Sequence, residues 1–139
     1  FPKFDWPRIS NPKITFPLED HLEEVEQREQ LSLRQAKHYF HERKDDIACI
    51  IIEPIQGEGG DNHFRPEFLR TLRQLCDEHE AMLIFDEIQC GMGRTGSMFD
   101  YQHSGVVPDI VAIAKPVAAG LPMGAIVVNE ATASAIRTS

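Results

Sequence analysis

Three side chains of different chemistry follow two apolar stretches of the sequence. Asp86 comes directly after the apolar run 81–85, Gln89 lies three residues later, and Lys115 ends a second predicted strand over 109–114. Uninterrupted apolar runs of this length are typical of strands in a parallel sheet that are buried on both faces. If both strands run in the same direction, their carboxyl ends meet at one edge, where ligands bind in open α/β sheets. The spacing therefore predicts a carboxylate, an amide and an amine around one crevice.

These three groups match what an aldehyde cofactor with a pyridine ring requires. A lysine becomes a nucleophile toward a carbonyl when partial desolvation lowers its pKa, so Lys115 could hold the aldehyde as an imine. A carboxylate at Asp86 would keep a pyridine nitrogen protonated and make the ring an electron sink. Gln89 could donate a hydrogen bond to a phenolate oxygen on the same ring. The chemistry that these residues predict is that of a pyridoxal 5'-phosphate site.

The sequence before Asp86 predicts a βαβ unit that would position it. Residues 47–52 form a predicted buried strand, and Pro66 opens a helix at its preferred first position. Between them, residues 53–60 contain three glycines in four positions, which permit backbone conformations that other residues resist. This loop could approach a ligand closely, or it could simply be a tight turn.

The sequence outside this unit predicts the remaining elements. Prolines exclude helix and central strand over residues 1–17, and a 3.6-residue apolar period predicts a helix over 18–44. The connection of about nine residues after Lys115 is too short for a parallel crossover, so the strand 124–128 should be antiparallel. Asn129 is a suitable cap for a final helix that starts at Glu130. The predicted fold class is α/β.

Composition excludes several classes of function. The chain has 139 residues, of which 42% are hydrophobic and 26% charged, as in soluble globular domains. A net charge of -8 argues against nucleic-acid binding, and no apolar run approaches membrane-spanning length. Three cysteines without close pairing fit a reducing, cytoplasmic setting.

His38 and His41 have no apparent third ligand, so we expect no metal site. The chain starts at Phe1 and stops within a helical pattern, so we expect a piece of a longer protein.

Several sequence blocks resemble the class III pyridoxal-phosphate aminotransferases, the ω-aminotransferases of fold type I. The order and spacing of the blocks also match, and the resemblance covers roughly residue 47 to the end. The opening eight residues and the stretch 59–68 look most like the L-lysine 6-transaminase branch, whereas the second half looks closer to the acetylornithine branch. The blocks are Glu53-Pro-Ile-Gln-Gly-Glu58, Phe85-Asp-Glu-Ile-Gln89, Arg94-Thr-Gly96, and Ala114-Lys115 with Gly120-Leu-Pro122.

The resemblance implies a role for each site residue. Lys115 would be the Schiff-base lysine, Asp86 the partner of the pyridinium nitrogen, and Gln89 the donor to the phenolic oxygen. Glu58 matches the gating glutamate of the family. The implied reaction moves a terminal (ω) amino group, possibly of L-lysine, to 2-oxoglutarate. One departure from the family is that its glycine-rich run after the lysine reads Pro116-Val-Ala-Ala119 here.

The resemblance also implies a place in a larger fold. Residues 1–139 would be part of a large domain with a mainly parallel sheet, helices on both faces and one antiparallel strand after Lys115. The upstream phosphate-binding loop, the ring-stacking aromatic residue and the small domain would lie outside this chain. The complete protein would be a homodimer, and the isolated chain is expected to be inactive.

Other functions remain open from the sequence alone. Another class III enzyme, such as an acetylornithine, ornithine or 4-aminobutyrate aminotransferase, an aminomutase or a decarboxylase, would keep the same cofactor residues. Residues 83–87 also fit a Walker-B strand of a nucleotide hydrolase, in which Glu87 would activate water. That function needs a phosphate-binding loop upstream, which residues 1–81 lack, and it leaves Lys115 and Gln89 unexplained. A non-catalytic fragment, with strand ends that are polar only because they meet solvent, is the third alternative.

Overall fold

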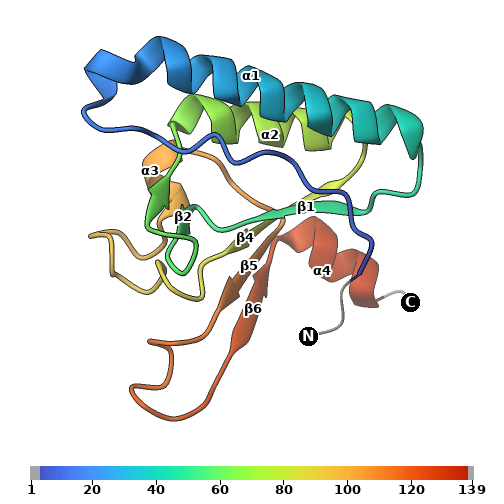
Figure 1. The fold of residues 1–139 in the computed structure, drawn as a ribbon. Helices are drawn as coiled ribbons and strands as arrows, with labels where there is room; N and C mark the ends of the chain where they lie inside the picture. Colours follow the sequence, from blue (N-terminus) through green and yellow to red (C-terminus); the bar gives the residue numbers. More distant parts are fainter. Residues whose placement is uncertain (1–3, 138–139) are drawn as a thin grey trace. The chain divides into compact units, whose positions relative to one another are not determined.

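The computed structural model describes residues 4–137, which divide into two compact units with the boundary between Ile47 and Ala48. The first unit holds an extended segment and one long helix. The second unit contains the remaining helices and every strand (Figure 1). All the predicted site residues belong to the second unit. No helix among the described residues is both long enough and apolar enough to cross a membrane.

In the first unit, an extended segment precedes helix α1 (Leu18–Glu42). The predicted absence of helix and strand is confirmed for residues 4–17, and residues 1–3 lie outside the described chain. The segment is tied to the helix by two hydrogen bonds of 2.7 Å, from Ser10 N to Gln35 Oε1 and from Arg28 Nη2 to Thr15 Oγ1. The helix ends two residues before the predicted Lys44, because Arg43 leaves helical geometry with φ -118° and ψ 49°.

The second unit is built on a four-stranded sheet with the strand order β1-β4-β5-β6 (Figure 1). Strands β1, β4 and β5 are parallel, and β6 pairs antiparallel with β5. This arrangement confirms the predicted α/β class, the mainly parallel sheet and the antiparallel strand after Lys115. The strands are β1 (Cys49–Ile52), β4 (Met82–Asp86), β5 (Ile110–Ile113) and β6 (Ala125–Val128).

Helix α2 (Pro66–Glu78) completes the predicted βαβ unit between β1 and β4. Pro66 occupies the first turn as predicted, where its missing N–H costs no hydrogen bond. The helix packs against β1 and β4 with an apolar face, and Leu83 and Phe85 on β4 are fully buried. Burying each such side chain contributes roughly 1.5–3 kcal/mol, so this layer holds β4 in place. The buried residues of α2 are Phe68, Leu69, Leu72, Leu75 and Cys76.

The prediction that β4 is buried on both faces is wrong for the described chain. Exposure alternates along the strand: Leu83 is 0% exposed, whereas Met82 is 38% exposed. The register places Ile51 and Ile126 on the same face as Met82, and they are 59% and 71% exposed. An apolar sequence shows that a face favours burial, but it does not show which layer covers it. Asp86 lies on this more open face, two residues after Ile84.

Three short elements and one cap complete the second unit. A small hairpin, β2 (Ile55–Gln56) with β3 (Asn62–His63), begins in the predicted glycine loop. It was not predicted, because strands of two residues are too short to show an alternating pattern in the sequence. A four-residue helix, α3 (Tyr101–Ser104), was also missed. The predicted cap of α4 (Glu130–Arg137) is confirmed, because Asn129 Oδ1 accepts a 2.8 Å hydrogen bond from Thr132 N.

Asp109 joins three elements at the amino-terminal end of β5. Its Oδ2 accepts hydrogen bonds from Arg73 Nη1 on α2 at 2.6 Å and from the Leu83 backbone on β4 at 2.8 Å. Its Oδ1 accepts a 2.9 Å bond from Asn129, the cap of α4. Burial alone would raise the pKa of Asp109, but the bonds from Arg73 and Leu83 outweigh burial and lower the pKa below 3.8.

Replacing Asp109 with asparagine should therefore lower the free energy of unfolding of the complete protein by about 2–3 kcal/mol near neutral pH. Because the folded-state pKa is lowered, this contribution is fully present above pH 3.8 and disappears as the pH falls through the folded-state value. The difference between wild type and Asp109→Asn in urea titrations should thus shrink at acidic pH. Asp77→Asn is the matched control, because Asp77 pairs with the same Arg73 at 2.7 Å but is 64% exposed. An equal loss in both variants would contradict the role of Asp109.

Candidate active site

Asp86 occupies the carboxyl-terminal end of β4, beside Ala112 on β5. Its side chain is half-buried. Oδ1 accepts a 3.0 Å hydrogen bond from the Ile88 backbone, which holds the carboxylate against the following turn. Within residues 4–137 no donor bonds to Oδ2. The carboxylate is thus fixed through one oxygen, while the other is available to a ligand.

Lys115 lies at the same edge of the sheet as Asp86. Strands β4 and β5 are parallel, with Asp86 paired to Ala112, and Lys115 follows the end of β5 two residues later. The chain turns at this point, with a 2.8 Å hydrogen bond from Val117 N to Ala114 O. The predicted juxtaposition of acid and amine at one edge is therefore consistent with the topology. The expected desolvation is not provided by the described residues, because Lys115 is exposed.

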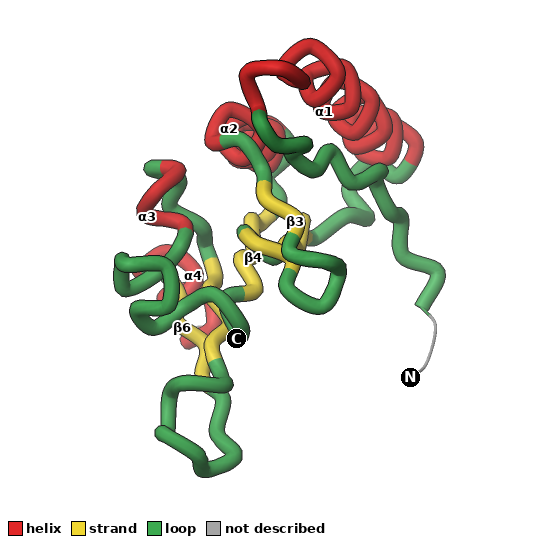
Figure 2. Tube along the Cα trace, turned by 60° about the vertical axis from the view of Figure 1, so that its left-hand side comes forward, coloured by secondary structure: helices red, strands yellow, loops and turns green. Residues whose placement is uncertain are grey.

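The loop after β4 and the hairpin loop after β1 meet at Gln89. Gln89 Nε2 donates a 3.3 Å hydrogen bond to Glu58 Oε1, so two residues predicted separately for the site are in contact. A Cβ atom built on Gly57 would lie only 2.5 Å from Gln89 Oε1, so a side chain at this position would displace the Gln89 amide. Gly57 N in turn donates to Glu53 Oε2 at 3.3 Å. In Figure 2, where loops are green, the hairpin loop is the one attached to β3, and the loop that carries Gln89 continues from the end of β4.

Glu87, directly after Asp86, is a buried carboxylate, and the sequence patterns do not predict a structural role for it. Its side chain is 0% exposed, and its two oxygens accept 2.8 Å hydrogen bonds from the backbone N–H groups of Asp100 and Tyr101. Burial raises its pKa, although the two backbone hydrogen bonds oppose this. A carboxylate sequestered in this way cannot activate a water, which contradicts the Walker-B alternative. Because successive side chains along a strand point to opposite faces of the sheet, the sequence could have predicted that Glu87 points away from Asp86.

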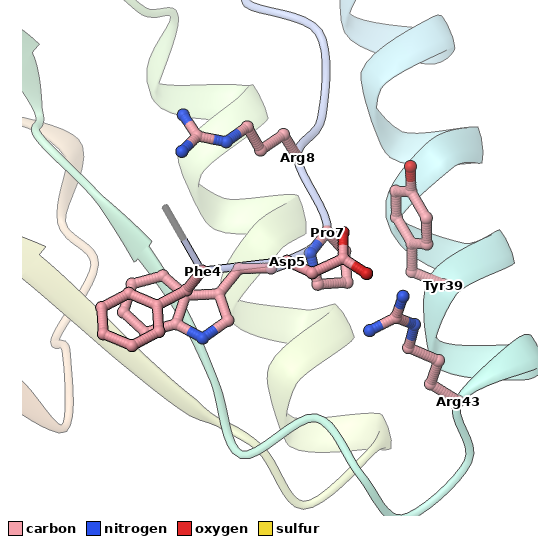
Figure 3. Close-up of a pocket in the computed structure, with 7 residues that line it drawn as sticks. Phe4, Asp5, Pro7, Arg8, Tyr39 and Arg43 are labelled. Atoms are coloured by element: carbon pink, nitrogen blue, oxygen red, sulfur yellow. The ribbon is translucent and has the colours of Figure 1, made fainter. Parts of the chain in front are cut away.

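Two concavities lie elsewhere and contain none of the predicted site residues. One, of about 580 Å³, lies in the first unit, where the rings of Phe4 and Trp6 stack with their centroids 4.7 Å apart. Figure 3 shows Asp5, Tyr39 and Arg43 around it. The other, of about 370 Å³, lies in the second unit between the β2–β3 hairpin and α3. Neither is the crevice that the sequence predicts at the sheet edge.

Comparison with known proteins places the chain in one family. Residues 3–139 match the family Aminotransferase class-III. The chain is 54% identical over 115 residues to the L-lysine-epsilon aminotransferase of Mycobacterium tuberculosis, covering 83% of this chain and 25% of that protein. It is 59% identical over 87 residues to the acetylornithine aminotransferase of Clostridium acetobutylicum, covering 63% of this chain and 22% of that protein. The chain thus spans about a quarter of the length of these relatives.

Solved structures agree with the sequence comparison. A lysine aminotransferase from M. tuberculosis, described as being in the internal aldimine form, superimposes with a TM-score of 0.87 at 46% identity, covering 98% of this chain and 30% of that one. An N-acetylornithine aminotransferase from Stenotrophomonas maltophilia gives a TM-score of 0.65 at 42% identity, covering 71% of this chain and 27% of that one. The family that the sequence blocks indicated is confirmed, and the chain belongs to the class III aminotransferases.

Proposed function

We propose that this chain is the central part of the large domain of a pyridoxal-phosphate-dependent aminotransferase. The proposal is supported by the topology, because the parallel strands that precede Asp86 and Lys115 are neighbours and bring their carboxyl ends to one sheet edge. Asp86 is the last residue of β4, Lys115 follows β5 by two residues, and Gln89, in the turn after Asp86, is hydrogen-bonded to Glu58. The phosphate-binding loop, the ring-stacking aromatic residue and the small domain would be supplied by other parts of a longer, homodimeric and cytoplasmic protein.

The residues at this edge fit pyridoxal phosphate. Asp86 presents an acceptor oxygen that no described residue occupies, which suits a protonated ring nitrogen. The Gln89 amide suits the ring's phenolic oxygen, and the exposed amine of Lys115 suits its aldehyde. No group of three His, Cys, Asp or Glu side chains that could hold a metal ion occurs among residues 4–137.

Each residue then has a distinct task in the proposed reaction. Pyridoxal phosphate, when bound, supplies an electron sink for the charge that develops on the amino donor. Lys115 would bind the cofactor covalently between turnovers and carry a proton on Nζ to and from the reacting carbon. Asp86, kept in place by Ile88 N, would hold the ring nitrogen protonated. Gln89 would orient the ring through its amide, and the bond to Glu58 would limit the rotation of that amide.

The proposed substrates are an ω-amino donor and 2-oxoglutarate. Similarity to L-lysine-epsilon aminotransferases, at 54% identity, favours L-lysine as the donor. The 59% identity to an acetylornithine aminotransferase supports an N-acetylornithine-type donor as the alternative. An ornithine or 4-aminobutyrate aminotransferase, an aminomutase or a decarboxylase would use the same cofactor residues and differ in the product.

A transaminase assay tests this proposal. The complete protein, loaded with pyridoxal phosphate, should form glutamate from 2-oxoglutarate with L-lysine as donor, and a panel with N-acetylornithine, ornithine and 4-aminobutyrate would identify the preferred donor. The isolated 139-residue chain should form none, because it lacks the rest of the cofactor site and leaves the edges of β1 and β6 unpaired. If the products are an isomerised or decarboxylated donor and no glutamate, the proposal is wrong, and the protein is an aminomutase or a decarboxylase of the same family.

Glu58 should act as a gate between the two half-reactions. The ω-amino donor presents a reacting carbon without a carboxylate, whereas 2-oxoglutarate presents one with a carboxylate. An arginine that serves the acceptor would be a costly unpaired charge when the donor is bound. Glu58 could neutralise that arginine and then swing aside. It is exposed and lies between Gly57 and Gly59, and its bond to Gln89 is long at 3.3 Å.

Glu58→Ala should therefore slow the ω-amine half-reaction more than the glutamate half-reaction, which single-turnover rates of the two halves would measure. The rate ratio should change by about tenfold, since a lost partner for a buried charge costs about 1–3 kcal/mol. Glu58→Gln, which keeps the shape and removes the charge, should behave alike. Glu78→Ala is the control, because Glu78 is an exposed acid at the end of α2. An unchanged ratio in Glu58→Ala would remove Glu58 from the mechanism.

A further inference from the structure

The loop that carries Gln89 is closed at its base by the side chain of Glu87. The two carboxylate oxygens of Glu87 accept hydrogen bonds from Asp100 N and Tyr101 N, both at 2.8 Å. Asp100 and Tyr101 lie 13 and 14 residues further along the chain, at the start of α3. The loop 88–99 is therefore enclosed between a strand end and a helix start that one side chain holds together.

The backbone of Glu87 is fixed as firmly as its side chain. Its N–H donates to Ala112 O on β5 at 2.9 Å, and its carbonyl accepts from Gly91 N at 3.0 Å. A Cβ atom on Gly91 would lie 2.8 Å from Glu87 O and 3.1 Å from Glu87 Oε2, so the loop can pack here only because residue 91 is glycine. Glu87 thus links β4, β5 and the loop, directly beside Asp86.

The charge of this side chain needs an explanation that packing alone does not give. Glu87 is fully buried and makes no ion pair with the described residues, so its desolvation is offset mainly by the two backbone donors. An apolar side chain could fill the same space without burying a charge, but it would leave both N–H groups without an acceptor. A glutamine would offer one acceptor oxygen and turn its NH2 toward the second N–H group.

We propose that Glu87 is a positioning residue, which uses its two carboxylate oxygens to hold the loop 88–99, and with it Gln89, at the cofactor edge. The inference rests on the proposed function, because Gln89 is placed at the edge to contact pyridoxal phosphate. Glu87 itself touches neither cofactor nor substrate. It acts through the loop, which connects Asp86 and Gln89 to α3, and through the contact of Gln89 with Glu58.

Amide hydrogen exchange and cofactor affinity of the complete protein test this role with a matched pair of variants. Without cofactor, Glu87→Gln should increase backbone amide exchange about tenfold or more at Asp100, at Tyr101 and in the loop 88–99. Asp109→Asn should instead increase exchange at Leu83, whose N–H donates to Asp109 Oδ2 at the opposite end of the sheet. Titration with pyridoxal 5'-phosphate should give a dissociation constant about tenfold or more higher in Glu87→Gln, and within about twofold of wild type in Asp109→Asn.

The outcomes separate the positioning role from general stability and from the proposed function. Unchanged exchange in the loop, unchanged cofactor affinity of Glu87→Gln, or equal weakening in both variants would overturn the role. If Glu87→Gln does not fold, Glu87→Asp replaces it in the same experiment. The loss of protection from amide exchange in Glu87→Asp should be confined to the loop 88–99. An equal loss of protection in β1 and β5 would overturn the role. A wild-type protein that takes up no pyridoxal phosphate would refute the proposed function, and exchange in the loop alone would then decide the role of Glu87.

Discussion

Replacing Lys115 with alanine should abolish transamination by the complete protein and remove the absorbance band of covalently bound cofactor that borohydride bleaches. Lys115 is the only lysine in the sequence of residues 48–139, so no other amine of the second unit can take its place. The loss should reach the limit of the assay, because a covalent catalyst and a proton carrier are removed together. Visible absorbance before and after borohydride, with turnover measured in parallel, would show both effects.

Two further variants separate the chemistry of Lys115 from its charge. Lys115→Arg keeps a positive charge, but a guanidinium stays protonated and is no nucleophile, so this variant should be as inactive as Lys115→Ala. Lys44→Ala removes an exposed lysine just after α1 and should retain both the band and the activity. A bleachable band that survives in Lys115→Ala would mean that another lysine holds the cofactor.

Replacing Asp86 with asparagine should cost about 3–4 kcal/mol of transition-state stabilisation, or roughly 10²–10³ in turnover. The substitution keeps the shape, and one amide oxygen can still accept the 3.0 Å bond from Ile88 N. It removes the negative charge that would hold the ring nitrogen protonated, so the electron sink is weakened while the fold is retained. Turnover at saturating donor, together with the amount of bound cofactor, measures the effect.

Asp77→Asn is the control for this substitution. It makes the same chemical change in the same unit, at an aspartate on α2 that is 64% exposed and pairs with Arg73. Its turnover should stay near that of the wild type. Near-native turnover of Asp86→Asn with cofactor bound would show that the charge of Asp86 has no part in the reaction.

The main features of the second unit could be predicted from the sequence because each rests on a local rule. Apolar runs marked β4 and β5, Pro66 marked the start of α2, and the short connection after Lys115 required an antiparallel strand. The structure differs where no local pattern exists. The β2–β3 hairpin has two-residue strands, and its loop is shaped by side-chain bonds such as those from Asn62 Nδ2 to Gln56 Oε1 at 3.1 Å and to Gly59 O at 2.9 Å.

The sequence indicates which residues could form the candidate site, but it does not show which of them are in contact. Strand ends and residue types indicated Asp86, Gln89 and Lys115, and the sequence blocks added Glu58. The bond between Gln89 and Glu58 joins residues 31 positions apart, and only the folded chain brings them together. The sequence alone leaves Glu87 open as a base that activates water. It does not show that the backbone N–H groups of Asp100 and Tyr101 donate hydrogen bonds to both of its carboxylate oxygens.

Localising the reduced cofactor on the chain is the most direct test of the account. The complete protein would be loaded with pyridoxal 5'-phosphate, reduced with borohydride, digested and analysed by peptide mass spectrometry. The account predicts one modified peptide, the one that contains Lys115, with the cofactor mass on that side chain. Cofactor fixed to any other residue, or a protein that binds the cofactor and yields no modified peptide, would contradict it.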